Sequence, residues 1–210
     1  MNPVHRRPPY PASDRARELH ATLRVADLHA DSLLWGRDLL ERGTRGHVDV
    51  PRLIEGRVAL QALAVTTKVP RNLSLDRNSD RTDDVLFVAL AQAWPTATIR
   101  SLLARALHQA DRARRTAARS GGRLTLVITA TELAAHLACY AADPARTASI
   151  LTIEGAQALD GDPANVDVLA DAGYRMMSPS HFFDTDFGGS AHGLEKGGLT
   201  ALGRAMVARM

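Results

Sequence analysis

Short apolar runs alternate with longer amphipathic segments along most of the chain, which is the pattern of strands separated by helices. The clearest run covers residues 57–67 between a glycine and a proline, as expected of a strand buried on both faces. Further strands are predicted at 24–28, 148–153 and 174–178, with another short apolar segment at 123–128. Strands that alternate with helices in this way favour an α/β fold with a parallel sheet.

Three helices are predicted before or between these strands. Residues 14–23 form the first and lead into a strand. Pro51 suits the first turn of the second helix, and Gly56 suits its end. Thr131 is expected to cap the third, which runs through Tyr140.

Three further helical patterns complete the prediction. A long helical pattern covers residues 83–118, and Pro95 is expected to break it. Another helix is expected to start at Asp162 and run through Asp171. The last begins near Thr200 and places four apolar side chains on one helical face: Leu202, Met206, Val207 and Met210. The pattern stops there without a following strand, so we expect the chain to end partway through a structural unit.

Composition fits a globular protein with one folded domain at residues 14–210. Of its 210 residues, 45% are hydrophobic and 23% are charged. Residues 1–13 carry arginines and prolines but no apolar segment of signal-peptide length, and are expected to form a flexible arm. No run approaches the roughly 18 apolar residues of a membrane span, so a cytoplasmic location is expected. The single Cys139 excludes an internal disulfide, and any metal site must use His, Asp and Glu.

The formal net charge is +3, and arginines concentrate at residues 100–123. This stretch could bind nucleic acid, but Asp111 and alanines are interspersed and no nucleic-acid motif accompanies the arginines. Aromatic residues make up only 4% of the chain, which leaves few side chains for base stacking. We therefore expect a solvated helix face and no nucleic-acid partner, with a basic nucleic-acid-binding protein as the weaker alternative.

His29 and Asp31 follow the first predicted strand and stand two residues apart. In an extended chain, positions i and i+2 point to the same side, so the imidazole and the carboxylate should project together. Both groups are good zinc ligands. A histidine at the end of a strand that is hydrogen-bonded to a nearby aspartate would give the same pattern, so the spacing alone leaves both interpretations open.

Two other predicted strands also end in polar groups, Glu154 and His181. Loops at the carboxyl ends of parallel strands carry function in α/β folds, above all in the (β/α)8 barrel, so these side chains could converge. A carboxylate directly after an apolar strand is costly to bury unless a cation compensates it. Glu154 could instead stand at the N-terminus of a following helix, and His181 could be a loop histidine bonded to backbone.

Several ordered blocks resemble the renal (membrane) dipeptidase family of zinc metallopeptidases, which belongs to the amidohydrolase-like metal-dependent hydrolases. The resemblance covers most of residues 24–210 and holds in the family's order. Its blocks are 27–32 (Asp-Leu-His-Ala-Asp-Ser), 47–53 (His-Val-Asp-Val-Pro-Arg-Leu), 153–159 (Ile-Glu-Gly-Ala-Gln-Ala-Leu), 173–181 (Gly-Tyr-Arg-Met-Met-Ser-Pro-Ser-His), 188–194 (Gly-Gly-Ser-Ala-His-Gly-Leu) and 198–204 (Gly-Leu-Thr-Ala-Leu-Gly-Arg).

The resemblance implies hydrolysis of dipeptides, often with a D-residue on the C-terminal side, through a hydroxide held between two zinc ions. His29 and Asp31 match the family's ligands for the first zinc, and Glu154 matches the carboxylate that bridges both. His181 matches the histidine that contacts the substrate's carbonyl oxygen and stabilises the oxyanion. The implied fold is a (β/α)8 TIM-type barrel, truncated here after about its first half.

Two departures from the family change these expectations. Asp184, expected near the substrate, stands where the family often has asparagine. The family's histidines for the second zinc and its proton-transferring aspartate come from later strands, and His192 is not counted as a replacement. At most one zinc should therefore be well held. The chain alone should be weakly active or inactive, and marginally stable unless it pairs with a copy of itself or with a complementary half-barrel chain, because an open barrel exposes two sheet edges.

Overall fold

The computed structural model describes residues 3–4 and 9–210. Two compact units are present, one formed by Met1–Leu63 with Arg114–Ile150 and the other by Ala64–Ala113 with Leu151–Met210. Residues 1–2 and 5–8 of the predicted N-terminal arm lie outside the described residues. Within that arm, Pro3 forms an isolated antiparallel bridge with Arg45 of the first unit.

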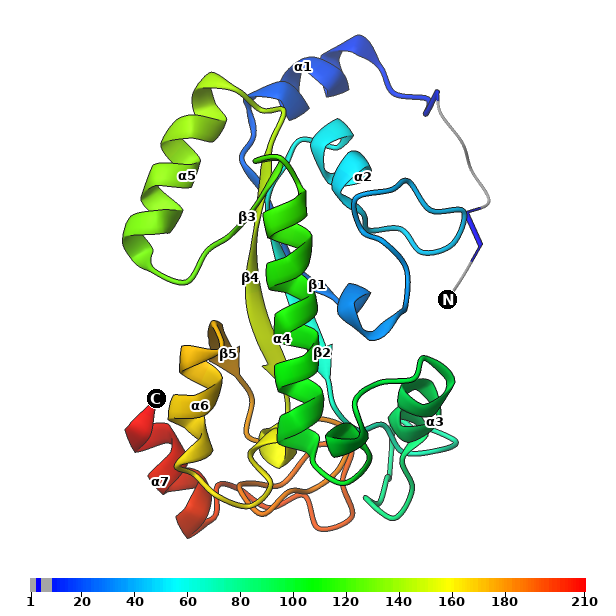
Figure 1. Cartoon of the computed structure of the whole chain (residues 1–210), viewed down its shortest axis with the longest axis vertical. Helices are drawn as coiled ribbons and strands as arrows, with labels where there is room; N and C mark the ends of the chain where they lie inside the picture. Colours follow the sequence, from blue (N-terminus) through cyan, green and yellow to red (C-terminus); the bar gives the residue numbers. More distant parts are fainter. Residues whose placement is uncertain (1–2, 5–8) are drawn as a thin grey trace. The chain divides into compact units, whose positions relative to one another are not determined.

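Five strands of the described chain form one sheet (Figure 1). The strand order is β1-β2-β4-β3, and β5 also pairs with β4. Pairing is parallel between β1 and β2, between β3 and β4, and between β4 and β5. The predicted parallel α/β sheet is therefore confirmed. The strands are β1 (Val25–Ala30), β2 (Val58–Thr66), β3 (Leu124–Leu126), β4 (Thr147–Glu154) and β5 (Tyr174–Met177).

The first unit begins with helix α1 (Asp14–Thr22), which leads into β1 as predicted. Helix α2 (Val50–Glu55) has Pro51 in its first turn and ends at Gly56, also as predicted. It begins there because the side chain of Asp49 accepts a hydrogen bond from the backbone N–H of Arg52. These capping signals are local, which is why the sequence alone located them.

Helix α5 (Ala130–Ala142) begins two residues earlier than predicted, and its cap is Thr129, not Thr131. Thr129 is extended, with φ −134° and ψ 156°, and its hydroxyl accepts the N–H of Glu132 at 3.1 Å. The Glu132 carboxylate accepts the N–H of Thr129 in return, at 2.9 Å. This reciprocal capping box satisfies two helix-end N–H groups, whereas a cap at Thr131 would satisfy one.

Two hydrogen bonds attach α5 to the start of β2 within the first unit. The Nε2 atom of His136 lies 2.8 Å from the carbonyl oxygen of Ala59. The hydroxyl of Tyr140 donates to the carbonyl of Arg57 at 2.7 Å. Both side chains are buried, so these polar groups are satisfied where water cannot reach them.

In the second unit, the long helical pattern is interrupted near Pro95, as predicted. Helix α3 (Asp84–Ala91) is followed by a 3₁₀ helix (Thr96–Ile99) and then by α4 (Leu102–Arg119), whose last turns belong to the first unit. Proline removes a backbone donor, so the helix cannot continue through it. No helix of the described chain combines the length and the apolar character that a membrane span requires.

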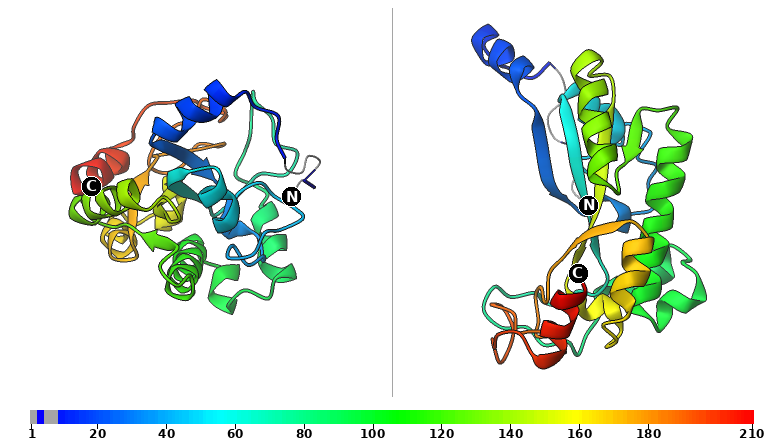
Figure 2. Two further views of the ribbon diagram at one scale, coloured as in Figure 1. Left: turned by 90° about the horizontal axis from the view of Figure 1, so that it is seen from above. Right: turned by 90° about the vertical axis from the view of Figure 1, so that its left-hand side faces the viewer.

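The second unit ends with α6 (Asn165–Asp171) and α7 (Ala201–Arg209), which pack against each other beside β5 (Figure 2). Thr200 caps α7 by accepting the N–H of Gly203 at 3.0 Å. The predicted apolar face of α7 is only partly correct. Met206 is fully buried, but Val207 is 48% exposed and Met210 is 61% exposed. The buried face of α7 is therefore narrower than the sequence pattern predicts.

Candidate metal centre

Strand β1 delivers the first two candidate ligands within the first unit. His29 lies near the end of β1, and Asp31 directly follows the strand at the start of a 3₁₀ helix (Ser32–Leu34). The Nε2 atom of His29 lies 3.5 Å from Oδ2 of Asp31. The backbone N–H of His29 donates to the carboxylate of Asp27 at 3.1 Å. The imidazole and the carboxylate therefore project together, as the spacing of two residues predicts.

Glu154 is the last residue of β4, and two polar groups of the second unit contact its carboxylate. The hydroxyl of Thr66, at the end of β2, donates to Oε2 at 2.6 Å. Nδ1 of His181 lies 3.3 Å from the same oxygen. The carboxylate is thus held by side chains at the ends of other strands and loops, at 12% exposure. The site roles of Glu154 and His181 stay predictions, and a 3₁₀ helix (Ala156–Leu159) begins two residues after Glu154.

The chain turns sharply after Glu154 because the next residue is Gly155, with φ +89°. A Cβ at this position would lie 2.0 Å from Oε1 of Gln157. The Nε2 of Gln157 in turn donates to the carbonyl of Glu154 at 2.8 Å. The positive φ therefore favours glycine here, whereas the space is limited only by the flexible end of the Gln157 side chain.

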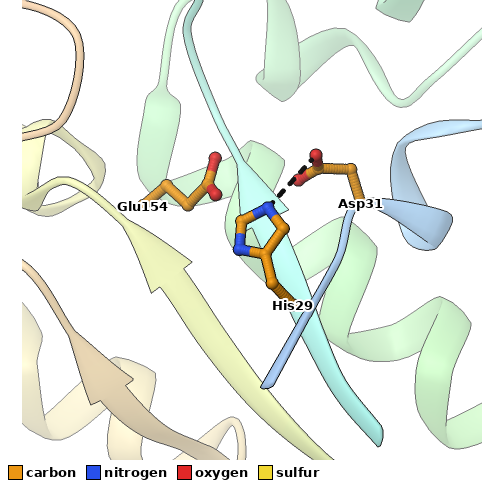
Figure 3. A group of neighbouring side chains, drawn as sticks. All are labelled: His29, Asp31 and Glu154. Atoms are coloured by element: carbon orange, nitrogen blue, oxygen red, sulfur yellow. Dashed lines mark ion pairs between the residues drawn. The ribbon is translucent and has the colours of Figure 1, made fainter. Parts of the chain in front are cut away.

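His29, Asp31 and Glu154 form a group of candidate metal ligands (Figure 3). Each offers one ligand atom, and these atoms all lie within 4.8 Å of one another. Two ligands of a tetrahedral zinc ion lie about 3.4 Å apart, since each is roughly 2.0–2.2 Å from the metal. The 3.5 Å between His29 and Asp31 fits that spacing, and one nitrogen with two carboxylates suits zinc.

The carboxylate of Asp184 accepts hydrogen bonds from the backbone of its own loop. Its Oδ1 accepts the backbone N–H of Ser190 at 2.7 Å, and its Oδ2 accepts those of Leu194 and Glu195 at 2.8 Å. Burial acts to raise the pKa of Asp184, but these hydrogen bonds, with one from Lys196, outweigh it and leave the pKa below its ordinary value. The predicted contact of Asp184 with substrate stays a prediction, because its carboxylate is committed to organising residues 190–196.

Sequence reasoning missed Thr66, although a signal for it was present. Thr66 ends an apolar strand with a polar group, which is the same pattern that drew attention to Glu154. His192, which the sequence analysis did not count as a ligand, contacts the backbone of another loop. Its Nδ1 lies 2.5 Å from the carbonyl of Leu75, and it does not join the candidate ligand group found among the described residues.

Two arginines of the basic stretch on helix α4 contact acidic side chains of the described chain. Arg105 is buried and donates to the carbonyls of Thr98 and Thr67 and to the carboxylate of Asp83. Arg119 pairs with Asp38 at 2.6 Å. The guanidinium of Arg105 therefore serves the fold, whereas the side chain of Arg119 is 63% exposed, and the expected absence of a nucleic-acid partner stays a prediction.

Three solved structures share the fold of the chain. The metallopeptidase named dipeptidase AC, of family M19, is 23% identical with a TM-score of 0.63, covering 90% of this chain and 55% of that one. A metallopeptidase from Rhodobacter sphaeroides, liganded with a phosphinate mimic of the dipeptide L-Ala-D-Ala, is 24% identical with a TM-score of 0.63, covering 90% and 56%. The probable dipeptidase PvdM from Pseudomonas aeruginosa is 19% identical with a TM-score of 0.65, covering 93% and 46%.

The chain spans about half the length of these structures. Their likeness confirms the predicted fold class, an α/β arrangement that resembles the barrel of the dipeptidases over about half its extent. No curated protein sequence matches the chain. The sequence model of the membrane dipeptidases, peptidase family M19, matches residues 13–210, which is nearly the whole chain. The chain belongs to the membrane dipeptidase family, peptidase family M19.

Proposed function

We propose that the chain is the metal-binding portion of a metallodipeptidase, in which His29, Asp31 and Glu154 hold one zinc ion. The single observation that carries this proposal is the group of three ligand atoms within 4.8 Å of one another. Membership of the membrane dipeptidase family supports it. The donor set of one imidazole and two carboxylates favours zinc over calcium or magnesium, which prefer oxygen ligands alone.

The side chains around the ligand group have separate roles in this proposal. When bound, a zinc ion lowers the pKa of water to about 7 and polarises a carbonyl. Thr66 orients Glu154 through the hydrogen bond to Oε2. His181, next to the same oxygen, donates to the carbonyl oxygen of the scissile peptide and stabilises the negative charge that develops there. Hydrolysis then adds the elements of water across the peptide bond, leaving a carboxylate and an amine.

The proposed substrates are dipeptides, including those with a D-residue on the C-terminal side. The metallopeptidase from Rhodobacter sphaeroides is liganded with a phosphinate mimic of L-Ala-D-Ala, which makes that dipeptide the natural first substrate to test. Three ligand side chains hold one zinc, and we propose no second ion within this chain. A chain with a single zinc is expected to be weakly active or inactive by itself, so metal binding is the more decisive measurement.

The experiment compares zinc uptake by the full chain and by Glu154→Gln, which preserves shape but removes a ligand charge. Equilibrium dialysis should give one tightly bound zinc per wild-type chain and a large loss of affinity in the variant. Glu41→Gln makes the same chemical change at an exposed position, and should behave as wild type. Equal zinc binding by all three proteins would contradict the proposal. Zinc-dependent hydrolysis of L-Ala-D-Ala that is lost in His29→Ala would extend it to a working enzyme.

A second candidate function is that of a subunit that requires a complementary chain. Two strands expose large apolar side chains: Leu28 on β1 is 62% exposed, and Met176 on β5 is 48% exposed. Strand β1 also ends the strand order, with β2 as its neighbour. An exposed apolar strand readily pairs with a strand of another chain. If the complementary chain is a second copy, sedimentation equilibrium should show self-association that Leu28→Lys weakens. A monomer at all concentrations would exclude pairing with a second copy.

A further inference from the structure

A buried asparagine connects two loops of the second unit beside His181. Asn78 lies in the loop between β2 and α3 and is only 5% exposed. Its backbone N–H donates to the carbonyl of His192 at 2.7 Å. Its side-chain Nδ2 lies 3.0 Å from the carbonyl of Phe182 and 3.2 Å from that of His192. One residue thus holds the backbone of the loop that follows β5 at two places.

The carboxamide of Asn78 is also fixed within its own loop. Its Oδ1 accepts the backbone N–H of Ser74 at 2.8 Å, and its Nδ2 lies 2.7 Å from the carbonyl of the same residue. Both the donor and the acceptor end of the amide are therefore engaged. A buried polar group with all its partners present fixes a single arrangement, because any other arrangement would leave it unsatisfied.

The backbone that Asn78 holds carries His181. Phe182 follows His181 directly, and their ring centroids lie 3.9 Å apart. The hydroxyl of Ser190 donates to the carbonyl of His181 and accepts the N–H of His192. The carbonyls of residues 181, 182 and 192 are thus all bonded by side chains within this cluster, which leaves the backbone next to the imidazole little freedom.

We propose that Asn78 is a positioning residue that keeps the imidazole of His181 beside Glu154 through the hydrogen bond to Phe182. The proposal rests on the role of His181 in the proposed function. Asn78 contacts neither the candidate ligands nor the reacting atoms, and it acts through the backbone. Its loss should therefore change the environment of the His181 imidazole without removing any of the candidate ligands His29, Asp31 and Glu154.

The test variant is Asn78→Asp, which keeps the shape and the acceptor oxygen but replaces the amide donor by a second oxygen. Asn165→Asp makes the same chemical change elsewhere in the second unit, where Nδ2 of Asn165 donates to the carbonyl of Leu159 at 2.9 Å. Imidazole signals of the full chain are recorded by NMR with labelled histidine. The signal that disappears in His181→Gln identifies His181, and His136 of the first unit serves as an internal reference.

We expect the His181 signal to shift or broaden in Asn78→Asp, with the His136 signal unchanged, and no such effect in Asn165→Asp. If Asn78→Asp does not fold, the same His181 and His136 signals are recorded for Asn78→Ser. That variant removes the amide without adding charge. An unchanged His181 signal, or an equal change in Asn165→Asp, would overturn the proposal. Failure of the proposed function would appear separately, as absence of zinc binding by the wild-type chain.

Discussion

The hydroxyl of Thr66 donates a 2.6 Å hydrogen bond to Oε2 of Glu154, and so connects the last residues of β2 and β4. Carboxylates that bind metals are commonly held in this way by a neighbouring donor, which fixes the orientation of the ligand. Because of this hydrogen bond, Oε2 of Glu154 is already oriented before a metal ion binds. Thr66 therefore belongs to the candidate metal centre, although it contributes no ligand of its own.

Replacing Thr66 by valine should weaken zinc binding. Valine keeps the branched shape but lacks the hydroxyl, and loss of such a supporting partner typically costs about 10- to 100-fold in metal affinity. Thr66→Ser retains the hydroxyl and should stay near wild type. Competition with a zinc-responsive chelator measures all three affinities. Equal affinities for the wild type and Thr66→Val would show that the hydrogen bond has no part in metal binding.

Asp184 should make the stability of the chain depend on pH in the acid range. Its pKa is lowered in the folded chain, so its stabilising contribution is fully present above the unfolded carboxyl pKa of about 3.9. That contribution is lost as the pH falls through the lower pKa of the folded state. Urea unfolding at a series of pH values should show wild type more stable than Asp184→Asn at pH 6, with the difference shrinking below pH 4. A difference that is constant with pH would contradict this account of the loop.

The two threonines near the start of α5 offer a direct comparison of caps. Thr129→Ala removes the hydroxyl that accepts the N–H of Glu132 and should lower the free energy of unfolding by about 1 kcal/mol. Thr131 lies inside the first turn, so Thr131→Ala should be neutral or slightly stabilising. Chemical denaturation of both variants provides the check. A larger loss at Thr131 would show that the helix begins where the sequence analysis first placed it.

Gly203 in α7 should not tolerate a side chain. A Cβ there would lie 1.8 Å from the backbone oxygen of Phe187, which cannot move away as a side chain could. Gly203→Ala should therefore destabilise the chain by about 1–3 kcal/mol, as overpacking does elsewhere. Gly197→Ala provides the matched control, because a Cβ at Gly197 would meet nothing within 4 Å. Thermal unfolding of the pair distinguishes them, and equal melting temperatures would rule out this close approach.

The sequence predicted the strands and most helix ends because these depend on local periodicity and capping. His29, Asp31 and Glu154 could be named because each stands at the end of an apolar strand, where parallel strands bring polar groups together. The misplaced cap at Thr131 was an avoidable error, because the pattern Thr-x-x-Glu from Thr129 to Glu132 was visible.

Other features depend on tertiary contacts and left no readable pattern. Asn78 lies in a polar loop without periodicity, and only the fold brings it 3.0 Å from the carbonyl of Phe182. The engagement of Asp184 with the N–H groups of residues 190–196 is likewise invisible in the sequence. On α7, helical periodicity gave Met206 and Val207 equal weight, yet packing buries the first and exposes the second. Periodicity identifies a face but not how much of it is covered.

The central prediction is that His29, Asp31 and Glu154 share one zinc ion. X-ray absorption at the zinc edge, on the full chain with one equivalent of zinc, tests this directly. We predict a shell of nitrogen and oxygen ligands at about 2.0–2.2 Å with imidazole scattering from a single histidine, which His29→Ala abolishes. A sulfur ligand from the exposed Cys139, or imidazole scattering that persists in His29→Ala, would contradict it.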